Sequence, residues 1–303
     1  MVRTLHFRGS FLSPRSGQGK PKRRRPREKR WRTHQTRPNR AGRAALTCEI
    51  NYRIEFRERC LLSCGMTNVL PDTIRRLYTD PGEYIDSDHP AVRDFASTAV
   101  PADASDREKA SLLYKAVRDG IRYNPYVNML TPETFRASSV LAAGNGYCVG
   151  KAALYAAACR VHGIPARVGF ADVRNHLTTE KLRQSMGTDV FTWHGFTEVY
   201  VDGAWRKATP TFNATLCAKV GVHPLDFDGH NDALLHPFDG AGRTYMQYVN
   251  DHGSYHDVPA KFLMREMAHD YANMQGEDMS GRDMEREAAE GLPTCVPRMT
   301  NIT

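Results

Sequence analysis

The sequence predicts a mixed fold in which a cysteine-bearing helix lies against a β-sheet. The glycine-rich turn at residues 144–146 is followed by Cys148 and by the run Ala152–Ala158, whose residues are mostly strong helix formers. Gly163 and then Pro165 supply the expected end of this helix, a left-handed residue followed by a helix breaker. Because alanine side chains are short, the helix can lie close to a sheet, and we expect Cys148 at its exposed tip.

A β-hairpin is the second observation that indicates this fold. Asp202-Gly203 is a favoured two-residue turn, and it fixes a register that pairs Tyr200 with Trp205 and Glu198 with Lys207. Both pairs are favourable cross-strand neighbours, because one is aromatic and the other joins opposite charges. The two pairs therefore support the same register independently.

Hydrophobic spacing places further elements on both sides of these two stretches. Ser105 followed by Glu108 is typical of a capping box at the start of a helix, which we expect to end near Asp119-Gly120. Strand-like alternation covers Ala166–Asp172. We also expect helices over Pro132–Ala142 and Lys261–Met274, a loop or short helix over Thr179–Met186, and a frayed tail over Glu277–Thr303.

Charge divides the chain into two parts. Residues 1–65 contain eighteen Lys and Arg but only four acidic residues, a net charge of +14, which leaves −6 for residues 66–303. The basic part has no apolar periodicity, so we do not expect it to fold alone. We expect residues 1–65 to be disordered, or not translated if the natural product starts at Met66, and residues 66–303 to form one domain.

The basic segment leaves several functions open. It could be an arm that contacts nucleic-acid phosphates, an organelle transit peptide or a membrane-surface anchor. A secretory signal is disfavoured, because no apolar run of about 7–15 residues follows the charges. No apolar run reaches about 18 residues, so no membrane span is expected. The seven cysteines lack the spacing of a disulfide framework or zinc ribbon, which favours a reducing, cytoplasmic location.

Cys148 and His194 are the candidate catalytic residues. The unpaired N–H groups and the dipole at a helix start favour a thiolate at Cys148. His194 begins a strand of the hairpin, opposite Thr211 and diagonal to Thr209, where its ring can reach a helix tip. Cys148 alone is compatible with an ordinary buried cysteine, and a lone histidine in a strand is more often a core residue whose nitrogens bond to the backbone. Brought together, they would form a thiolate–imidazolium pair in which the imidazole acts first as base and then as acid.

The order of motifs resembles the transglutaminase-like superfamily of papain-fold cysteine enzymes, bacterial type. The motifs are Gly146-Tyr147-Cys148, Gly163-Ile164-Pro165-Ala166-Arg167, His194-Gly195-Phe196-Thr197-Glu198-Val199-Tyr200, Trp205 and Thr209-Pro210-Thr211. They cover roughly residues 112–213. Each motif alone is weak, whereas their combination is specific.

The resemblance implies an α+β fold with a papain/transglutaminase-like core, in which the cysteine-bearing helix packs on an antiparallel sheet. It also implies a triad of Cys148, His194 and a third residue, usually Asp. Thr209 stands at that third position, and its hydroxyl can orient an imidazole but cannot stabilise an imidazolium as a carboxylate would. Residues of other loops that could replace it are Asp172, Asn175 and Asn213.

The implied activity is attack by Cys148 on the amide carbonyl of a peptide or protein substrate, through a thioester. Water as acceptor would make the chain a peptidase or amidase, and an amine would make it a cross-linking transferase. Because Thr209 stands where the family usually has Asp, the chain could instead be a catalytically inactive binding module. Nucleic acid is an expected partner only if the basic segment is part of the protein, and no membrane partner is expected.

No cofactor or metal is predicted. Asp226-Phe227-Asp228-Gly229-His230-Asn231-Asp232 has the wrong acid spacing for a calcium loop and lacks its closing Glu, so a turn is expected there. His252 and His256 are four residues apart, but no third ligand is identifiable.

Overall fold

The computed structural model describes residues 69–175, 180–234, 246–276, 279 and 281–290. The expected basic segment and its boundary at Met66 lie outside the described residues, as does the end of the expected tail. None of the described helices is long and apolar enough to cross a membrane.

The fold class is α+β, as predicted. One four-stranded antiparallel sheet has the order β5-β4-β3-β6, and β1 and β2 form a short parallel pair. The strands are β1 Arg122–Tyr123, β2 Asn145–Gly146, β3 Ala166–Asn175, β4 Val190–Val201, β5 Ala204–Ala208 and β6 Met246–Tyr255. The helices are α2 Asp72–Thr79, α3 Pro90–Ala99, α4 Asp106–Gly120, α5 Ala137–Ala143, α6 Cys148–Val161, α7 Glu180–Met186, α8 Ala214–Val220, α9 Ala260–Asp270 and α10 Met284–Glu290, with 3-10 turns η1 Pro132–Phe135 and η2 Ala272–Gly276.

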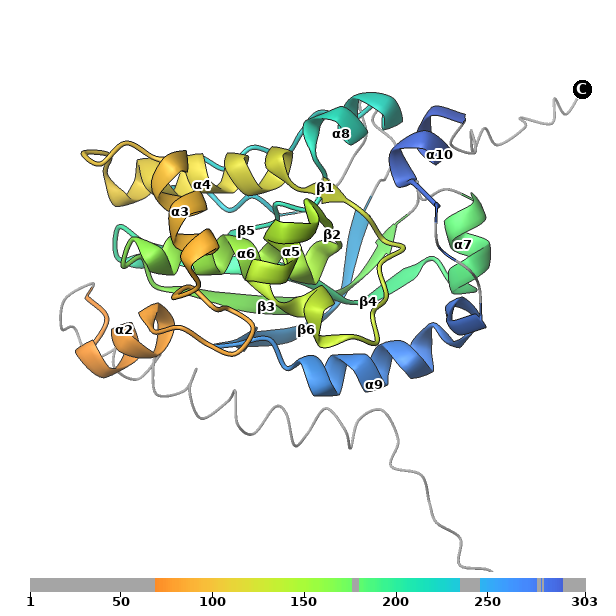
Figure 1. Cartoon of the computed structure of the whole chain (residues 1–303), viewed down its shortest axis with the longest axis horizontal. Helices are drawn as coiled ribbons and strands as arrows, with labels where there is room; N and C mark the ends of the chain where they lie inside the picture. The colour runs from red at the N-terminus through yellow and green to blue at the C-terminus, as the bar shows by residue number, and fades with distance from the viewer. Residues whose placement is uncertain (1–68, 176–179, 235–245, 277–278, 280, 291–303) are drawn as a thin grey trace, which may run out of the picture. The chain divides into compact units, whose positions relative to one another are not determined.

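Helix α6 is the centre of the fold. It packs on β3 and β4 and is covered by α3, α4 and α5 (Figure 1). Every residue from Cys148 to Arg160 is buried, so the helix has no solvent face. Its alanines allow this close packing on all sides, as expected from their small size. Gly163, with a φ of 71°, ends the helix in the left-handed conformation that the sequence predicts.

Two contacts hold β4 against α6. A Cβ added at Gly195 would lie 2.8 Å from the Cα of Val149, so only glycine allows this approach of strand and helix. Two residues later, the Thr197 hydroxyl donates a hydrogen bond of 2.9 Å to the carbonyl of Ala152. These contacts bring the start of β4 to the N-terminal turn of α6.

The predicted hairpin register is confirmed from Val201–Ala204 to Thr197–Ala208, but the predicted pairing of His194 with Thr211 is wrong, because the ladder ends before these residues and His194 pairs with Ala171 of β3. Tyr200 pairs with Trp205 and Glu198 with Lys207, and the ladder between β4 and β5 ends at Thr197 and Ala208. The predicted capping box is also present, because the side chain of Ser105 accepts from the backbone of Glu108 and the Glu108 side chain accepts in return. These features depend on local sequence, which explains why the sequence predicts them.

Two expected elements differ from the structure. The single helix expected over Pro132–Ala142 is divided, because Arg136 has an extended backbone between η1 and α5. The expected frayed tail contains α10, whose Glu287 is buried and accepts a hydrogen bond of 2.5 Å from the hydroxyl of Tyr126. Arg282 packs over the same Tyr126 ring at 4.0 Å. These long-range partners, absent from the local pattern, hold α10 on the domain.

Candidate active site

Cys148 is the first residue of α6, preceded by Tyr147 at the N-cap position. Its placement at the helix start follows the prediction, but the expected exposed tip is wrong, because only 7% of Cys148 is accessible. Tyr271, the residue that follows α9, lines the same cavity as Cys148. A wall supplied from more than one hundred residues away has no local sequence signal.

Burial raises the pKa of the Cys148 thiol to about 11. Hydrogen bonds from the backbone N–H groups of Gly195, Val149 and Cys148 act in the opposite direction but do not outweigh burial. The N–H groups at the helix start therefore favour the thiolate as expected, but the loss of water around the sulfur disfavours it more strongly. With its pKa raised to about 11, the sulfur is a neutral thiol at pH 7.

His194 lies on β4, is 4% exposed, and its Nε2 atom has no hydrogen-bond partner. Burial lowers the pKa of His194 to about 4, so the imidazole is neutral at pH 7. The resting thiolate–imidazolium pair that the sequence leads us to expect is therefore absent from this state. A neutral imidazole beside a neutral thiol can still accept the thiol proton while the sulfur attacks.

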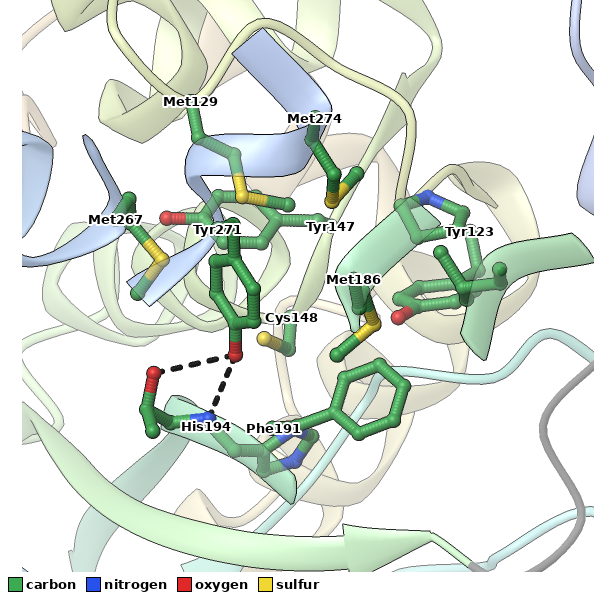
Figure 2. A pocket seen from close by; sticks show the side chains of 13 residues that line it. Tyr123, Met129, Tyr147, Cys148, Met186, Phe191, His194, Met267, Tyr271 and Met274 are labelled. Carbon is green, nitrogen blue, oxygen red and sulfur yellow. Dashed lines mark hydrogen bonds between the residues drawn. The ribbon is translucent and has the colours of Figure 1, made fainter. Parts of the chain in front are cut away.

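One cavity of about 30 Å³ joins the two residues (Figure 2). Its walls come from α6, α7, α9, η2, the start of β4 and the loop after β1. Four of its lining residues are methionines, which are labelled in Figure 2. The lining residues are Tyr123, Pro125, Met129, Tyr147, Cys148, Leu182, Met186, Phe191, Thr192, His194, Met267, Tyr271 and Met274.

Thr209 follows directly after β5, and its backbone is fixed on both sides. Its N–H donates to the carbonyl of Ala233 at 2.9 Å, and its carbonyl accepts from the hydroxyl of Tyr114 at 3.0 Å. The side-chain oxygens of Thr209 and Thr211 are both buried without a hydrogen-bond partner. The hydroxyl of Thr209 therefore makes no hydrogen bond to His194 in this state.

The hydrogen bonds described for the three alternative orienting residues are made to groups other than His194. Asn213 uses its side chain on the N–H of Tyr123, on Thr215 and on Glu285. Asn175 is buried at the end of β3, where its N–H donates to the carbonyl of Asp189.

Asp172 directly follows Ala171, the residue that pairs with His194, but its carboxylate contacts Trp193 and not His194. One of its oxygens, Oδ1, accepts from the N–H of Trp193 at 3.1 Å and lies 2.7 Å from the Nε2 atom of His252. Burial acts to raise the pKa of the Asp172 carboxyl, but the interactions with His252, the Trp193 N–H and Asn250 together outweigh it, and the pKa is lowered.

The sequence does not predict the roles of three residues that position the site, namely Gly195, Trp193 and Tyr271. Gly195 belongs to a predicted motif, but its contact with Val149 and its N–H near the sulfur depend on packing. Trp193 has a φ of 56°, which is unusual for a bulky residue. Tyr271 accepts hydrogen bonds from the N–H and hydroxyl of Thr192 at 2.7 and 3.1 Å.

Within the described ranges, no group of three or more His, Cys, Asp or Glu residues is arranged to hold a metal ion. The expected turn at residues 226–232 is present, and Asp228 accepts there from the N–H groups of His230 and Asn231. The cavity beside Cys148 offers a thiol, an imidazole and apolar side chains. Its chemistry is therefore that of a nucleophile with a neighbouring base.

Residues 93–210 match a family model described as the transglutaminase-like superfamily. No curated protein matches the chain. Among solved structures, the chain is similar to a candidate cysteine protease from Cytophaga hutchinsonii, with 20% identity and a TM-score of 0.38 over 62% of this chain and 48% of that chain. The chain thus spans about half the length of that protein.

Two further solved structures are similar. A candidate protease from Parabacteroides distasonis has 19% identity and a TM-score of 0.30, over 45% of this chain and 25% of that chain. A TGase has 14% identity and a TM-score of 0.28, over 80% of this chain and 57% of that chain.

Proposed function

We propose, on the premise that residues 93–210 match the transglutaminase-like superfamily, that the chain is a cysteine-dependent acyl-transfer enzyme acting on amides. The observation that carries the proposal is the shared cavity of Cys148 and His194 at the start of α6. Cys148 is the nucleophile and His194 is the base that activates it.

The first half-reaction forms a thioester. The Cys148 sulfur attacks the amide carbonyl carbon while the thiol proton passes to the His194 imidazole. The C–N bond then breaks, and His194 returns the proton to the leaving amine. Because the pKa of Cys148 is raised to about 11 and that of His194 is lowered to about 4, this proton moves during the attack and not before it.

The second half-reaction releases the acyl group. Water or a second amine gives a proton to His194 as it attacks the thioester carbonyl, and the departing sulfur recovers a proton. Water makes the enzyme an amidase or peptidase, and an amine makes it a transferase. The backbone N–H groups at the start of α6 and the N–H of Gly195 are the available donors for the developing oxyanion.

Trapping the thioester tests the proposal. We expect 4-nitrophenyl acetate to acetylate the parent enzyme at Cys148, as seen by intact mass and peptide mapping. Cys148→Ala should abolish this acetylation, and His194→Ala should slow it by about 10²-fold or more. Cys159→Ala is the matched control, because Cys159 is a buried cysteine of the same helix that does not line the cavity. Acetylation that is independent of His194 would contradict the proposal.

A binding module without catalysis is the second candidate. It is favoured by Thr209 at the position where a carboxylate is expected, and by the buried Nε2 atom of His194 that has no partner. This candidate function predicts no acyl-enzyme with any activated acyl donor. An acylated Cys148 that turns over would eliminate it.

The basic segment supports a third activity, nucleic-acid binding, only through its composition. Such binding should weaken steeply with salt and disappear when residues 1–65 are deleted. The absence of binding at low salt would remove this activity.

A further inference from the structure

We propose that the acyl group taken up beside Cys148 is uncharged and apolar. This inference rests on the proposed function and names the class of substrate for the same site. Thirteen of the described residues line the cavity, and none of these is Asp, Glu, Lys or Arg. The polar side chains that line it are those of Cys148, His194, Thr192 and the tyrosines Tyr123, Tyr147 and Tyr271.

The wall chemistry discriminates strongly against charge. A carboxylate or ammonium that enters the cavity loses its water without gaining a counter-charge, which is costly in an apolar site. An apolar acyl chain instead gains from contact with the methionines, and each buried methylene should increase the acylation rate about fourfold.

The volume of the cavity limits the length of the acyl chain that fits without movement of the cavity walls. A volume of about 30 Å³ has room for about two water molecules. Longer chains therefore require the walls to move. Met129, Met186, Met267 and Met274 make that movement inexpensive, because methionine is unbranched and adapts its rotamer to the space available.

A series of esters with one leaving group tests this inference. We expect 4-nitrophenyl butyrate to have a higher kcat/KM than 4-nitrophenyl acetate, and 4-nitrophenyl hemisuccinate to react at least about 100-fold more slowly than the butyrate ester. If no ester acylates Cys148, the proposed function fails. If the esters acylate Cys148 and hemisuccinate matches butyrate, the proposed function stands and the apolar specificity is overturned.

Paired lysine variants locate the specificity in the cavity. Met274→Lys places a cation in the wall at a half-buried position, so it should raise the hemisuccinate-to-butyrate ratio by about tenfold. Met264→Lys is the matched control, because Met264 is a half-buried methionine of the neighbouring helix α9 that does not line the cavity. An equal change of ratio in both variants would overturn the inference.

We also infer that Asp172 and His252 position His194 through a β-bulge in β4. In the pairing of β3 with β4, Ala171 faces His194 but Val173 faces Phe191. Thr192 and Trp193 are therefore both opposite Asp172, directly before His194. A bulge changes the direction in which the following side chain points.

Side chains from other elements hold both N–H groups of this bulge. The N–H of Thr192 donates to the hydroxyl of Tyr271, and the N–H of Trp193 donates to Oδ1 of Asp172. His252 holds the carboxylate in place from β6 and stacks flat on the Trp193 ring, with a centroid distance of 3.8 Å and an interplanar angle of 11°.

The backbone of Trp193 requires such support. A φ of 56° is unfavourable for a bulky side chain and persists only where surrounding contacts impose it. Asp172 supplies the hydrogen bond that imposes it and His252 supplies the ring contact. Loss of the carboxylate would let this backbone relax and rotate the adjacent His194 away from Cys148.

Two substitutions of Asp172 separate positioning from general stability. Asp172→Ala removes the acceptor, and with the butyrate ester it should lower kcat by about tenfold or more while KM changes less than about twofold. Asp172→Asn keeps an acceptor oxygen for the Trp193 N–H and should restore most of kcat. His252→Phe keeps a ring on Trp193 but cannot donate to Asp172, and it should lower kcat by an intermediate amount.

Asp189→Ala is the matched control, because Asp189 directly precedes β4 and its side chain forms an exposed ion pair with Arg174. It should leave kcat unchanged. The inference is overturned if Asp172→Ala lowers the melting temperature but leaves kcat per folded molecule unchanged, or if Asp172→Asn fails to restore kcat. If the butyrate ester does not acylate the parent enzyme at all, the proposed function has failed, and this result is distinct from both.

Discussion

Gly195 lies so close to Val149 that a Cβ on the glycine would lie 2.8 Å from the Val149 Cα and 3.1 Å from its backbone nitrogen. Both neighbouring atoms are backbone, so they cannot turn aside. We expect Gly195→Ala to lower the free energy of unfolding by about 1–3 kcal/mol, measured by chemical denaturation. It should also slow acylation of Cys148, because the strand carrying His194 is displaced from α6.

Gly120→Ala provides the comparison for this prediction. Gly120 is the last residue of α4, and a Cβ there would meet nothing within 4 Å. We expect this variant to be neutral or slightly stabilising. If the Gly195→Ala and Gly120→Ala proteins have equal free energies of unfolding, the contact of residue 195 with Val149 tolerates a Cβ without loss of stability.

Thr209→Asp tests the missing carboxylate. The Oγ1 of Thr209 and the Nε2 of His194 are both buried without partners. A carboxylate at residue 209 should raise the pKa of His194 and accelerate acylation of Cys148 by about tenfold, with the fold retained. The pKa of His194 is measured by NMR titration of the imidazole signals.

Thr209→Asn separates charge from shape in this experiment. The amide has the size of the carboxylate but carries no charge, so it should give little acceleration. An equal gain from Asn and Asp, or an unchanged pKa of His194 in the Asp variant, would show that another group already orients the imidazole.

The pH dependence of acylation follows from the burial of His194. Burial lowers the pKa of His194 to about 4, so the imidazole remains a free base at pH 5 and is lost as a base only when the pH falls through about 4. We therefore expect the acidic limb of kcat/KM to lie near pH 4. A limb near pH 6.5, the ordinary histidine value, would show that the imidazole is solvated in the working enzyme.

Buried Lys151 should make stability depend on pH. Its Nζ donates to the carbonyls of Arg118 and Ile121 at the end of α4, and burial lowers its pKa to about 7. The unfolded chain, with a lysine pKa near 10.5, then binds more protons than the folded chain between these values. Stability therefore increases as pH rises from 7 toward 10.5, by at most about 1.4 kcal/mol per pH unit.

Lys151→Met should remove this rise. Urea denaturation at pH 7, 8 and 9 measures it, and Lys115→Met, a change at an exposed position of α4, should preserve the slope of the parent. A parent protein whose stability does not change over this range would contradict the lowered pKa of Lys151.

The parts of the fold that the sequence predicts are those determined by neighbouring residues. Asp202-Gly203 sets the hairpin register, Ser105 and Glu108 cap α4, and Gly163 ends α6. Each of these depends on backbone preferences within a few residues, and those preferences are visible in one sequence.

The parts that the sequence does not predict arise from contacts between distant segments. The expected thiolate at Cys148 follows from the helix start, whereas burial raises the pKa of its thiol and the cavity beside it is lined by residues as distant as Tyr271, 123 residues later. Helix α10 has few apolar residues and is held by Tyr126 and Arg282. The motif Thr209-Pro210-Thr211 does not identify the residue that orients His194. The hydroxyl of Thr209 is buried there without a hydrogen-bond partner.

The four methionines around Cys148 also make the cavity sensitive to oxidation. Conversion of Met129 or Met274, which are half-buried, to the sulfoxide would place a strong dipole in an otherwise apolar wall. Peroxide treatment of enzyme whose Cys148 is reversibly blocked should then lower butyrate acylation after unblocking, and methionine sulfoxide reductase should restore it. Full recovery with a thiol reductant alone would place the damage on Cys148 and would contradict oxidation of the methionines in the cavity wall.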